Sequence, residues 1–201
     1  PIRISIAMTD EVRDMIVESA ATFFNRFGFK HTTMENIAES IHKAKGLIYY
    51  YFKSKEELFK EVLWNDIRRI KAHLMAIANS EDDTHITLKK FVHARLELLE
   101  GATSYHEVIK AQIYHKSHVF LDDIKNDFED FEKSQLSSII RRGEQRGDFK
   151  VESIPSTVNG ILTVLGSLDF SLFLIKKRVE LDTINDEIST LIVNSVRREI
   201  A

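Results

Sequence analysis

Proline is almost absent from this chain of 201 residues, and this restricts the folds that the sequence can form. Pro1 and Pro155 are the only prolines, so more than 150 consecutive residues contain none. β-Architectures of this size need many turns, in which proline and glycine are enriched, whereas the interiors of long helices exclude proline. The sequence therefore predicts an all-α fold.

The composition is that of an ordinary globular protein, with 43% hydrophobic and 29% charged residues. These values exclude a disordered chain and a protein with several membrane spans. The sequence has no cysteine, which excludes disulfide scaffolds, thiolate zinc sites and cysteine nucleophiles. No sustained apolar segment of the kind found in signal peptides follows the first residues, so we expect a cytoplasmic protein.

Apolar residues at helical spacing and capping residues divide the first part of the chain into helices. A first helix is expected from Thr9, as its N-cap, to about Phe27, with Gly28 ending it at positive φ. Thr32 with Glu35 matches a capping box for a short second helix, with Thr33 as the competing N-cap. Residues 42–44 then form a turn before a second short helix at about 45–51.

The rest of the chain is also predicted to be helical. Ser54 with Glu57 matches another capping box, which opens a long helix. Residues 79–84 are polar and acidic and are expected to form a loop. Further helices are expected at about 86–100, 104–116, 119–146, 155–177 and 183–199.

Positive charge is concentrated in one segment, which runs from the turn through the second short helix to the start of the long helix. Residues 42–55 contain four lysines and no acidic residue. The first 60 residues carry nine Lys/Arg and eight Asp/Glu, whereas the other 141 carry 19 and 23, and the net charge is −3. Two short helices joined by a tight turn are typical of a helix-turn-helix, whose second helix enters the major groove of DNA.

The residue types in this segment suit DNA recognition. Gly46 allows the backbone to approach DNA closely, Lys45 can donate to guanine, and Leu47 can contact a thymine methyl. Tyrosine hydroxyls and Lys55 can bind phosphates. The candidate DNA-binding residues are Thr33, Lys43, Lys45, Gly46, Leu47, Tyr49, Tyr50 and Lys55. The alternative is a solvated basic face beside core aromatic residues.

The same region resembles a known family. Its motifs are Phe24-x3-Gly28-Phe29, Thr33-x3-Ile37-Ala38, and Lys45-Gly46 followed by the run Tyr-Tyr-Tyr-Phe-Lys-Ser-Lys-Glu-Glu-Leu from Tyr49 to Leu58. Over about residues 10–63 the chain is similar to the N-terminal domain of TetR-family transcriptional regulators. The resemblance implies a ligand-responsive regulator, in most cases a repressor, that binds a palindromic double-stranded DNA operator as a homodimer.

The resemblance also implies two domains. We place a three-helix, helix-turn-helix DNA-binding domain at residues 1–55 and a helical ligand-binding and dimerisation domain at residues 56–201. Three turn residues depart from the family pattern, in which glycine stands at the position of His42, an apolar residue at that of Lys43, and a Ser or Thr cap at that of Ala44. Histidine is enriched at positive φ among non-glycine residues. The missing side-chain cap at Ala44 is expected to lower the stability of the second short helix by about 1 kcal/mol.

The segment from Val158 to Ile175 is apolar around nearly the whole helix. Its eighteen residues just reach the length of a membrane span, but polar residues interrupt it, so we expect no membrane insertion. A helix of this kind can pack on its own domain with one face and on a second subunit with the other. The residues expected at such a dimer interface are Gly160, Val164, Leu168, Leu191 and Ser195. The alternative is an intrachain core.

A pocket for an effector needs apolar walls and a few polar groups. The candidates are Phe91, Tyr105, Ile109, Ile113, Phe128, Phe131 and Asp169, for an unknown apolar or amphipathic small molecule, and the alternative for each is plain core. His115, His118 and Asp122 could together bind a divalent metal on one continuous helix, as in an all-α metal-dependent enzyme. A dimeric adaptor without DNA binding is a third hypothesis. We favour the regulator and expect no enzyme activity, cofactor or metal.

Overall fold

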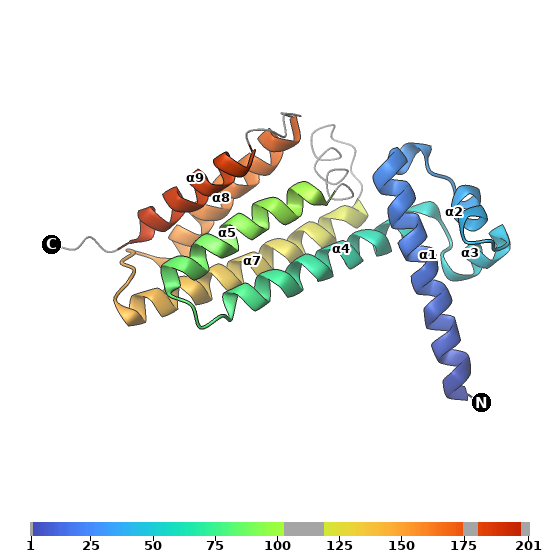
Figure 1. The fold of residues 1–201 in the computed structure, drawn as a ribbon, viewed down its shortest axis with the longest axis horizontal. Helices are drawn as coiled ribbons and strands as arrows, with labels where there is room; N and C mark the ends of the chain where they lie inside the picture. Colours follow the sequence, from blue (N-terminus) through green and yellow to red (C-terminus); the bar gives the residue numbers. More distant parts are fainter. Residues whose placement is uncertain (1, 103–118, 175–180, 198–201) are drawn as a thin grey trace. The chain divides into compact units, whose positions relative to one another are not determined.

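A computed structural model of the chain describes residues 2–102, 119–174 and 181–197 (Figure 1). Within these residues the regular secondary structure is helical, which confirms the all-α prediction, and β pairing is limited to one bridge between Phe149 and Arg197. The chain divides into two compact units. Unit 1 contains the chain up to Asp66, and unit 2 contains Ile67–Ala102 and the described residues from Asp122 onward.

Unit 1 is built from the helices α1 (Ile2–His31), α2 (Met34–Ser40), α3 (Lys45–Tyr51) and the first part of α4 (Lys55–Ala78). Helix α2 packs against α1 and α3. All four helices contribute buried apolar residues to one core. These residues are Ile16, Val17, Ala20, Phe24, Met34, Ile37, Ala38, Ile48, Phe52, Leu58, Phe59, Val62 and Leu63.

Helix α1 begins at Ile2, so the prediction of Thr9 as its N-cap was wrong. Neither glycine nor proline stands between residues 2 and 9, and nothing in that segment interrupts the helix. The predicted break at Gly28 is confirmed, because Gly28 has φ 76° and ψ 167°, although helical conformation resumes as far as His31. Glycine adopts this backbone conformation without the strain that a Cβ would bring.

The start of α2 differs in one residue from the predicted capping box. Thr33, and not Thr32, is the N-cap, and it forms the box with Asn36 instead of Glu35. Thr32 is buried, and its hydroxyl lies 2.9 Å from the carbonyl oxygen of Gly28 and 3.2 Å from that of Phe23, to which it donates. Thr32 therefore stabilises the corner between α1 and α2.

Unit 2 contains the rest of α4, α5 (Thr84–Gly101), α7 (Val119–Arg146) from Asp122 onward, α8 (Ile154–Leu174) and α9 (Leu181–Val196). These bounds lie close to the predicted ranges, whereas the helix predicted at 104–116 lies outside the described residues. Helix α5 packs against both α8 and α9. The predicted domain boundary coincides with the start of α4, while the two units divide within α4, between Asp66 and Ile67.

Two glycines, Gly143 and Gly147, allow the chain to turn at the C-terminal end of α7. Gly147 has φ 80°, and the amide of Asp148 donates to the carbonyl of Gly143 at 2.8 Å, which closes a Schellman turn. A Cβ on Gly143 would lie 2.0 Å from the ring of Phe149, which is buried against it. The turn leads the chain back to α9, where the amide of Lys150 donates to the carbonyl of Val196 at 3.0 Å.

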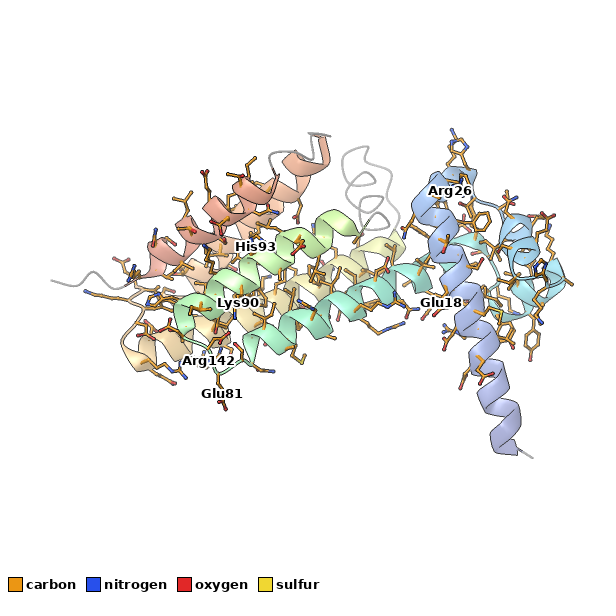
Figure 2. All side chains as sticks on the ribbon, in the orientation of Figure 1. Glu18, Arg26, Glu81, Lys90, His93 and Arg142 are labelled. Carbon is orange, nitrogen blue, oxygen red and sulfur yellow. The ribbon has the colours of Figure 1, made fainter. Side chains whose placement is uncertain are left out.

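The end of unit 2 at the α4–α5 loop is closed by polar contacts. Lys90 forms an ion pair with Asp82 at 2.7 Å, and the guanidinium of Arg142 donates to the carbonyl of Ala78 at 2.5 Å. Figure 2 shows Lys90, Arg142 and Glu81 at this end of the unit. In the part of the chain that the structure describes, no helix combines the length and the apolar character that crossing a bilayer requires.

Candidate nucleic-acid interface

The turn between α2 and α3 has the hydrogen bonds of a Schellman motif. His42 has φ 54°, its amide donates to the carbonyl of Glu39 at 3.1 Å, and the amide of Lys43 donates to that of Ala38 at 2.9 Å. His42 thus stands at the left-handed position that glycine usually occupies. Histidine is one of the non-glycine residues enriched at positive φ, and His42 adopts that conformation here.

Helix α3 begins without help from a side chain. Ala44 is its N-cap and makes no side-chain capping bond, as expected from the methyl group that stands where Ser or Thr would cap. The amide of Leu47 donates to the carbonyl of Ala44 at 2.9 Å and forms the first turn. Packing of the buried face of α3 therefore supports this short helix more than capping does.

The two faces of α3 differ sharply in exposure. Ile48 is completely buried, and Phe52, just after the helix, is also in the core. Tyr49 and Tyr50 are 39% and 69% exposed. The other candidates divide in the same way: Lys43, Lys45 and Gly46 are exposed, and Leu47 is half-buried. A Cβ on Gly46 would meet no atom within 4 Å, so the backbone is open to solvent at this point.

Lys45 is paired within the chain by a residue that the sequence analysis did not select. Its ammonium forms an ion pair with Glu35 of α2 and lies 5.5 Å from the centre of the Tyr49 ring. The hydrogen bond between the two side chains lowers the pKa of Glu35 and raises that of Lys45. An acidic residue in the first turn of a helix is ordinarily explained by the helix dipole, so nothing in the sequence marked Glu35 as part of the interface.

Thr33 is exposed, but its hydroxyl already has intrachain partners. The hydroxyl donates to Oδ1 of Asn36 at 2.7 Å and accepts from the amide of Asn36 at 3.1 Å. A phosphate that accepts from this hydroxyl would have to replace the bond to Asn36 Oδ1. The contact of Thr33 with DNA stays a prediction.

Lys55 is half-buried and joins the end of α1 to the start of α4. Its Nζ donates to the carbonyl of Phe29 at 2.8 Å and to that of Thr32 at 3.0 Å, and lies 4.5 Å from the centre of the Phe29 ring. These bonds use two of the three N–H groups of the ammonium. Lys55 therefore has a structural task, and its predicted contact with a phosphate stays a prediction.

Two further basic residues of unit 1, Lys53 and Arg26, have exposed side chains. Neither is among the DNA-binding residues predicted from the sequence. Lys53 follows α3, and its Nζ donates to the carbonyl of Tyr50 at 3.4 Å. Arg26 lies near the end of α1, with its guanidinium 5.1 Å from the centre of the Phe27 ring (Figure 2).

The capping box predicted at the start of α4 is only half formed. Ser54 caps the helix, because its hydroxyl accepts from the amide of Glu57 at 3.1 Å. The Glu57 carboxylate accepts from the backbone amide of Lys53, whereas a full capping box requires the amide of Ser54.

Unit 2 contains a buried charged cluster at one of the predicted pocket residues. Arg95 of α5 donates through Nε to Glu132 of α7 at 2.7 Å and through both terminal nitrogens to the Asp169 carboxylate of α8. The three side chains are only 3%, 5% and 12% exposed. Burial raises the pKa of Glu132, while the two carboxylates hold the pKa of Arg95 above its ordinary value against the opposing effect of burial.

Aromatic residues predicted for the pocket lie in the same unit. Phe91 and Phe128 are fully buried, and Phe131 is half-buried with its ring 6.3 Å from that of Phe128. Tyr105, Ile109 and Ile113 lie outside the described residues. Arg95 and Glu132 were missed, although a charged residue within the apolar stripe Leu88, Phe91, Val92, Leu96 and Leu99 was a usable sign.

The residues predicted for a dimer interface are mostly exposed in the single chain. Val164 and Leu191 are 48% and 67% exposed, Gly160 and Ser195 are exposed, and Leu168 is half-buried. Helix α8 instead buries Val158, Ile161 and Leu165, so it is not buried on every side within one chain. This exposure supports the interface, which stays a prediction.

The histidines of the alternative metal site, His115 and His118, lie outside the described residues. Asp122, the third member, is exposed near the start of α7. Among the residues that the structure describes, no group of three or more His, Asp or Glu side chains is arranged to hold a metal ion.

Comparisons with known proteins agree with the helix-turn-helix of unit 1 and with the all-helical fold. Residues 16–62 match the family described as bacterial regulatory proteins, tetR family. The repressor KstR2 of Rhodococcus jostii is 25% identical over 144 residues, which are 70% of this chain and 71% of that protein. A regulator from Saccharomonospora viridis, solved with choline, has a TM-score of 0.81 at 18% identity and covers 94% of this chain and 100% of its own.

A second solved structure, FadR from Bacillus subtilis with stearoyl-CoA, has a TM-score of 0.72 at 17% identity and covers 91% of this chain and 98% of its own. At such identities these two structures support the fold alone. The matched N-terminal segment contains α2, the Schellman turn and α3, which form the helix-turn-helix described above. Residues 16–62 belong to the tetR family of bacterial regulatory proteins, and the chain is a DNA-binding transcriptional regulator.

Proposed function

We propose that this regulator is a cytoplasmic repressor that binds a two-fold symmetric operator as a homodimer and acts by binding, without enzyme activity. The observation that carries the proposal is the division of α3 into two faces. Lys45, Gly46, Tyr49 and Tyr50 are exposed, whereas Ile48 is in the core. A helix held by one face can present the other to base edges and phosphates in the major groove.

The exposed apolar residues of unit 2 support the dimer. Val164 and Leu191 expose large apolar side chains, and a partner subunit that covered them would remove this surface from water. In a two-fold dimer the two copies of α3 would enter successive major grooves, about 34–36 Å apart. The operator would then be a palindrome with half-sites one helical turn apart.

The effector is proposed to bind in unit 2 and to be an apolar or amphipathic small molecule. Two of the structural neighbours carry stearoyl-CoA and choline, one a long-chain thioester and the other a small cation. Here, the Arg95 cluster offers buried charges in a unit whose core contains Phe91 and Phe128. A ligand that binds better to a dimer with the wrong spacing of its α3 helices would release DNA.

The test begins with selection of bound sequences from a random pool of duplex DNA. We expect a two-fold symmetric site to be enriched, with an affinity that falls steeply with salt. Lys45→Ala should weaken operator binding, because it removes a donor to a base edge. Enrichment of no site, or a Lys45→Ala protein with unchanged operator affinity, would contradict the proposal. The release step is tested on the selected operator by titrating fatty acyl-CoA and choline separately.

A further inference from the structure

We propose that Glu35 is a specificity-determining residue of the DNA interface, which together with Lys45 recognises a G·C base pair and weakens binding to all other DNA. The inference rests on the operator binding by α3 proposed above. It differs from that proposal in giving an acidic residue of α2, outside the predicted DNA-binding set, a direct part in the choice of sequence.

The two side chains meet on the exposed surface of the helix-turn-helix. Glu35 lies in the first turn of α2 and Lys45 is the first residue of α3. About half of each side chain is exposed, 48% for Glu35 and 51% for Lys45, although the two form an ion pair. The Lys45 ammonium is also held near the Tyr49 ring, 5.5 Å from its centre. A flexible lysine is thereby restricted to one region of the DNA-facing surface.

The charges of the pair explain why it would disfavour non-specific binding. An unpaired lysine at this position would bind any phosphate and release counterions. Pairing with Glu35 cancels that charge locally, and the carboxylate itself repels the DNA backbone. The surface around Lys45 therefore gains little from phosphates alone and needs a partner that also satisfies the carboxylate.

A G·C base pair supplies both partners in the major groove. Guanine presents its N7 and O6 as acceptors, to which Lys45 can donate, and cytosine presents its N4 amino group, from which a carboxylate can accept. A neighbouring donor and acceptor on the protein thus match neighbouring acceptors and a donor on the DNA. Phosphates offer only acceptors, so they satisfy Lys45 but not Glu35.

The experiment compares the wild type with four variants on the selected operator and on random duplex DNA over a salt series. Glu35→Gln removes the negative charge of the Glu35 carboxylate and keeps the shape of the side chain. Glu39→Gln is the matched control, since Glu39 is an exposed acidic residue on the same helix. Lys45→Met and the double variant Glu35→Gln with Lys45→Met test whether the effect passes through the pair. Melting curves establish that each variant is folded.

We expect Glu35→Gln to raise the affinity for random DNA and to steepen its salt slope by about 0.9, the value for one added phosphate contact. The ratio of operator to random affinity should fall by about tenfold, within the range for one lost base contact. Glu39→Gln should shift both affinities by a similar factor and leave the ratio unchanged. In the Lys45→Met background, Glu35→Gln should leave the salt slope for random DNA nearly unchanged, because no lysine is freed to bind a phosphate.

Three results would overturn the inference. In the first, Glu35→Gln leaves the ratio as high as Glu39→Gln does. In the second, Glu35→Gln steepens the salt slope for random DNA as much without Lys45 as with it. In the third, the operator has no G·C pair whose replacement selectively weakens the wild type and spares Glu35→Gln. Failure of the proposed function is a different observation, namely that the wild type enriches no operator at all.

Discussion

His42 is the residue at which the sequence departs most from the expected turn, and the structure shows how the turn survives. Its φ of 54° is a conformation that glycine adopts freely and that strains most other residues. His42→Gly should raise the free energy of unfolding by up to about 1 kcal/mol, and the β-branched His42→Val should lower it by about 1 kcal/mol or more. Urea denaturation followed by circular dichroism measures both, and a valine variant as stable as the wild type would contradict this backbone conformation.

Lys55 provides a second test at the residue scale, because structural and DNA-contacting roles make different predictions. Lys55→Met keeps the aliphatic stem but removes the hydrogen bonds to Phe29 and Thr32. We expect unfolding to become easier by about 1–2 kcal/mol, since these bonds come from a charged donor. The salt slope of operator binding should stay the same if the ammonium serves only the fold. A reduced slope with unchanged stability would instead indicate a phosphate contact.

At the scale of elements, α3 combines a core-facing side with a side that is open at Gly46. Gly46→Ala should leave the fold intact or stabilise it by up to about 1 kcal/mol, because alanine favours helix and its Cβ would meet no atom within 4 Å. Operator affinity should fall by about tenfold, or 1.4 kcal/mol, if the backbone approaches DNA here. Thermal melting and operator titration on the same sample separate the two effects. Unchanged affinity would mean that DNA does not approach this residue.

The Arg95 cluster links α5, α7 and α8, and it makes the stability of unit 2 depend on pH. Burial raises the pKa of Glu132 above its ordinary value of 4.5, so the folded chain retains a proton that the unfolded chain releases. The stabilisation is complete below about pH 4.5 and declines as the pH rises through the raised value. The amide of Glu132→Gln does not titrate, so unfolding free energies from pH 4 to 8 should show the wild type losing stability relative to the variant. A constant difference would contradict the raised pKa.

At the scale of the whole molecule, the exposed apolar residues of unit 2 predict that the protein is a homodimer and not a monomer. Leu191→Lys should shift a homodimer toward monomer, because a buried charge without a partner opposes association. Operator affinity should fall with it, since both half-sites must be bound together. Ile86→Lys is the control, as Ile86 is another exposed apolar residue of unit 2, at 49%, outside the predicted interface. Sedimentation equilibrium measures the mass, and a Leu191→Lys dimer as tight as the wild type would exclude this interface.

Sequence reasoning was accurate where the governing interactions are local. The absence of proline and the periodicity of apolar residues predicted the helices, and Gly28 predicted the break in α1, since backbone conformation and capping depend on a few neighbouring residues. It was less accurate at helix ends. Thr33 capped α2 in place of Thr32, whose hydroxyl instead found carbonyl partners at the end of α1. Two candidate caps next to each other are separated only by the packing of the preceding helix.

The sequence by itself determined the all-α class, the helix-turn-helix and the concentration of positive charge around α3, because each depends on residue type and spacing along one segment. The partners of single charged groups were decided only by the tertiary structure. Lys55 bonds to carbonyls 23 and 26 residues away, Arg95 to carboxylates 37 and 74 residues away, and Lys45 to Glu35 across a turn. Electrostatic and hydrogen-bond energies depend on distance and burial in the folded chain, and neither quantity can be read from the order of residues.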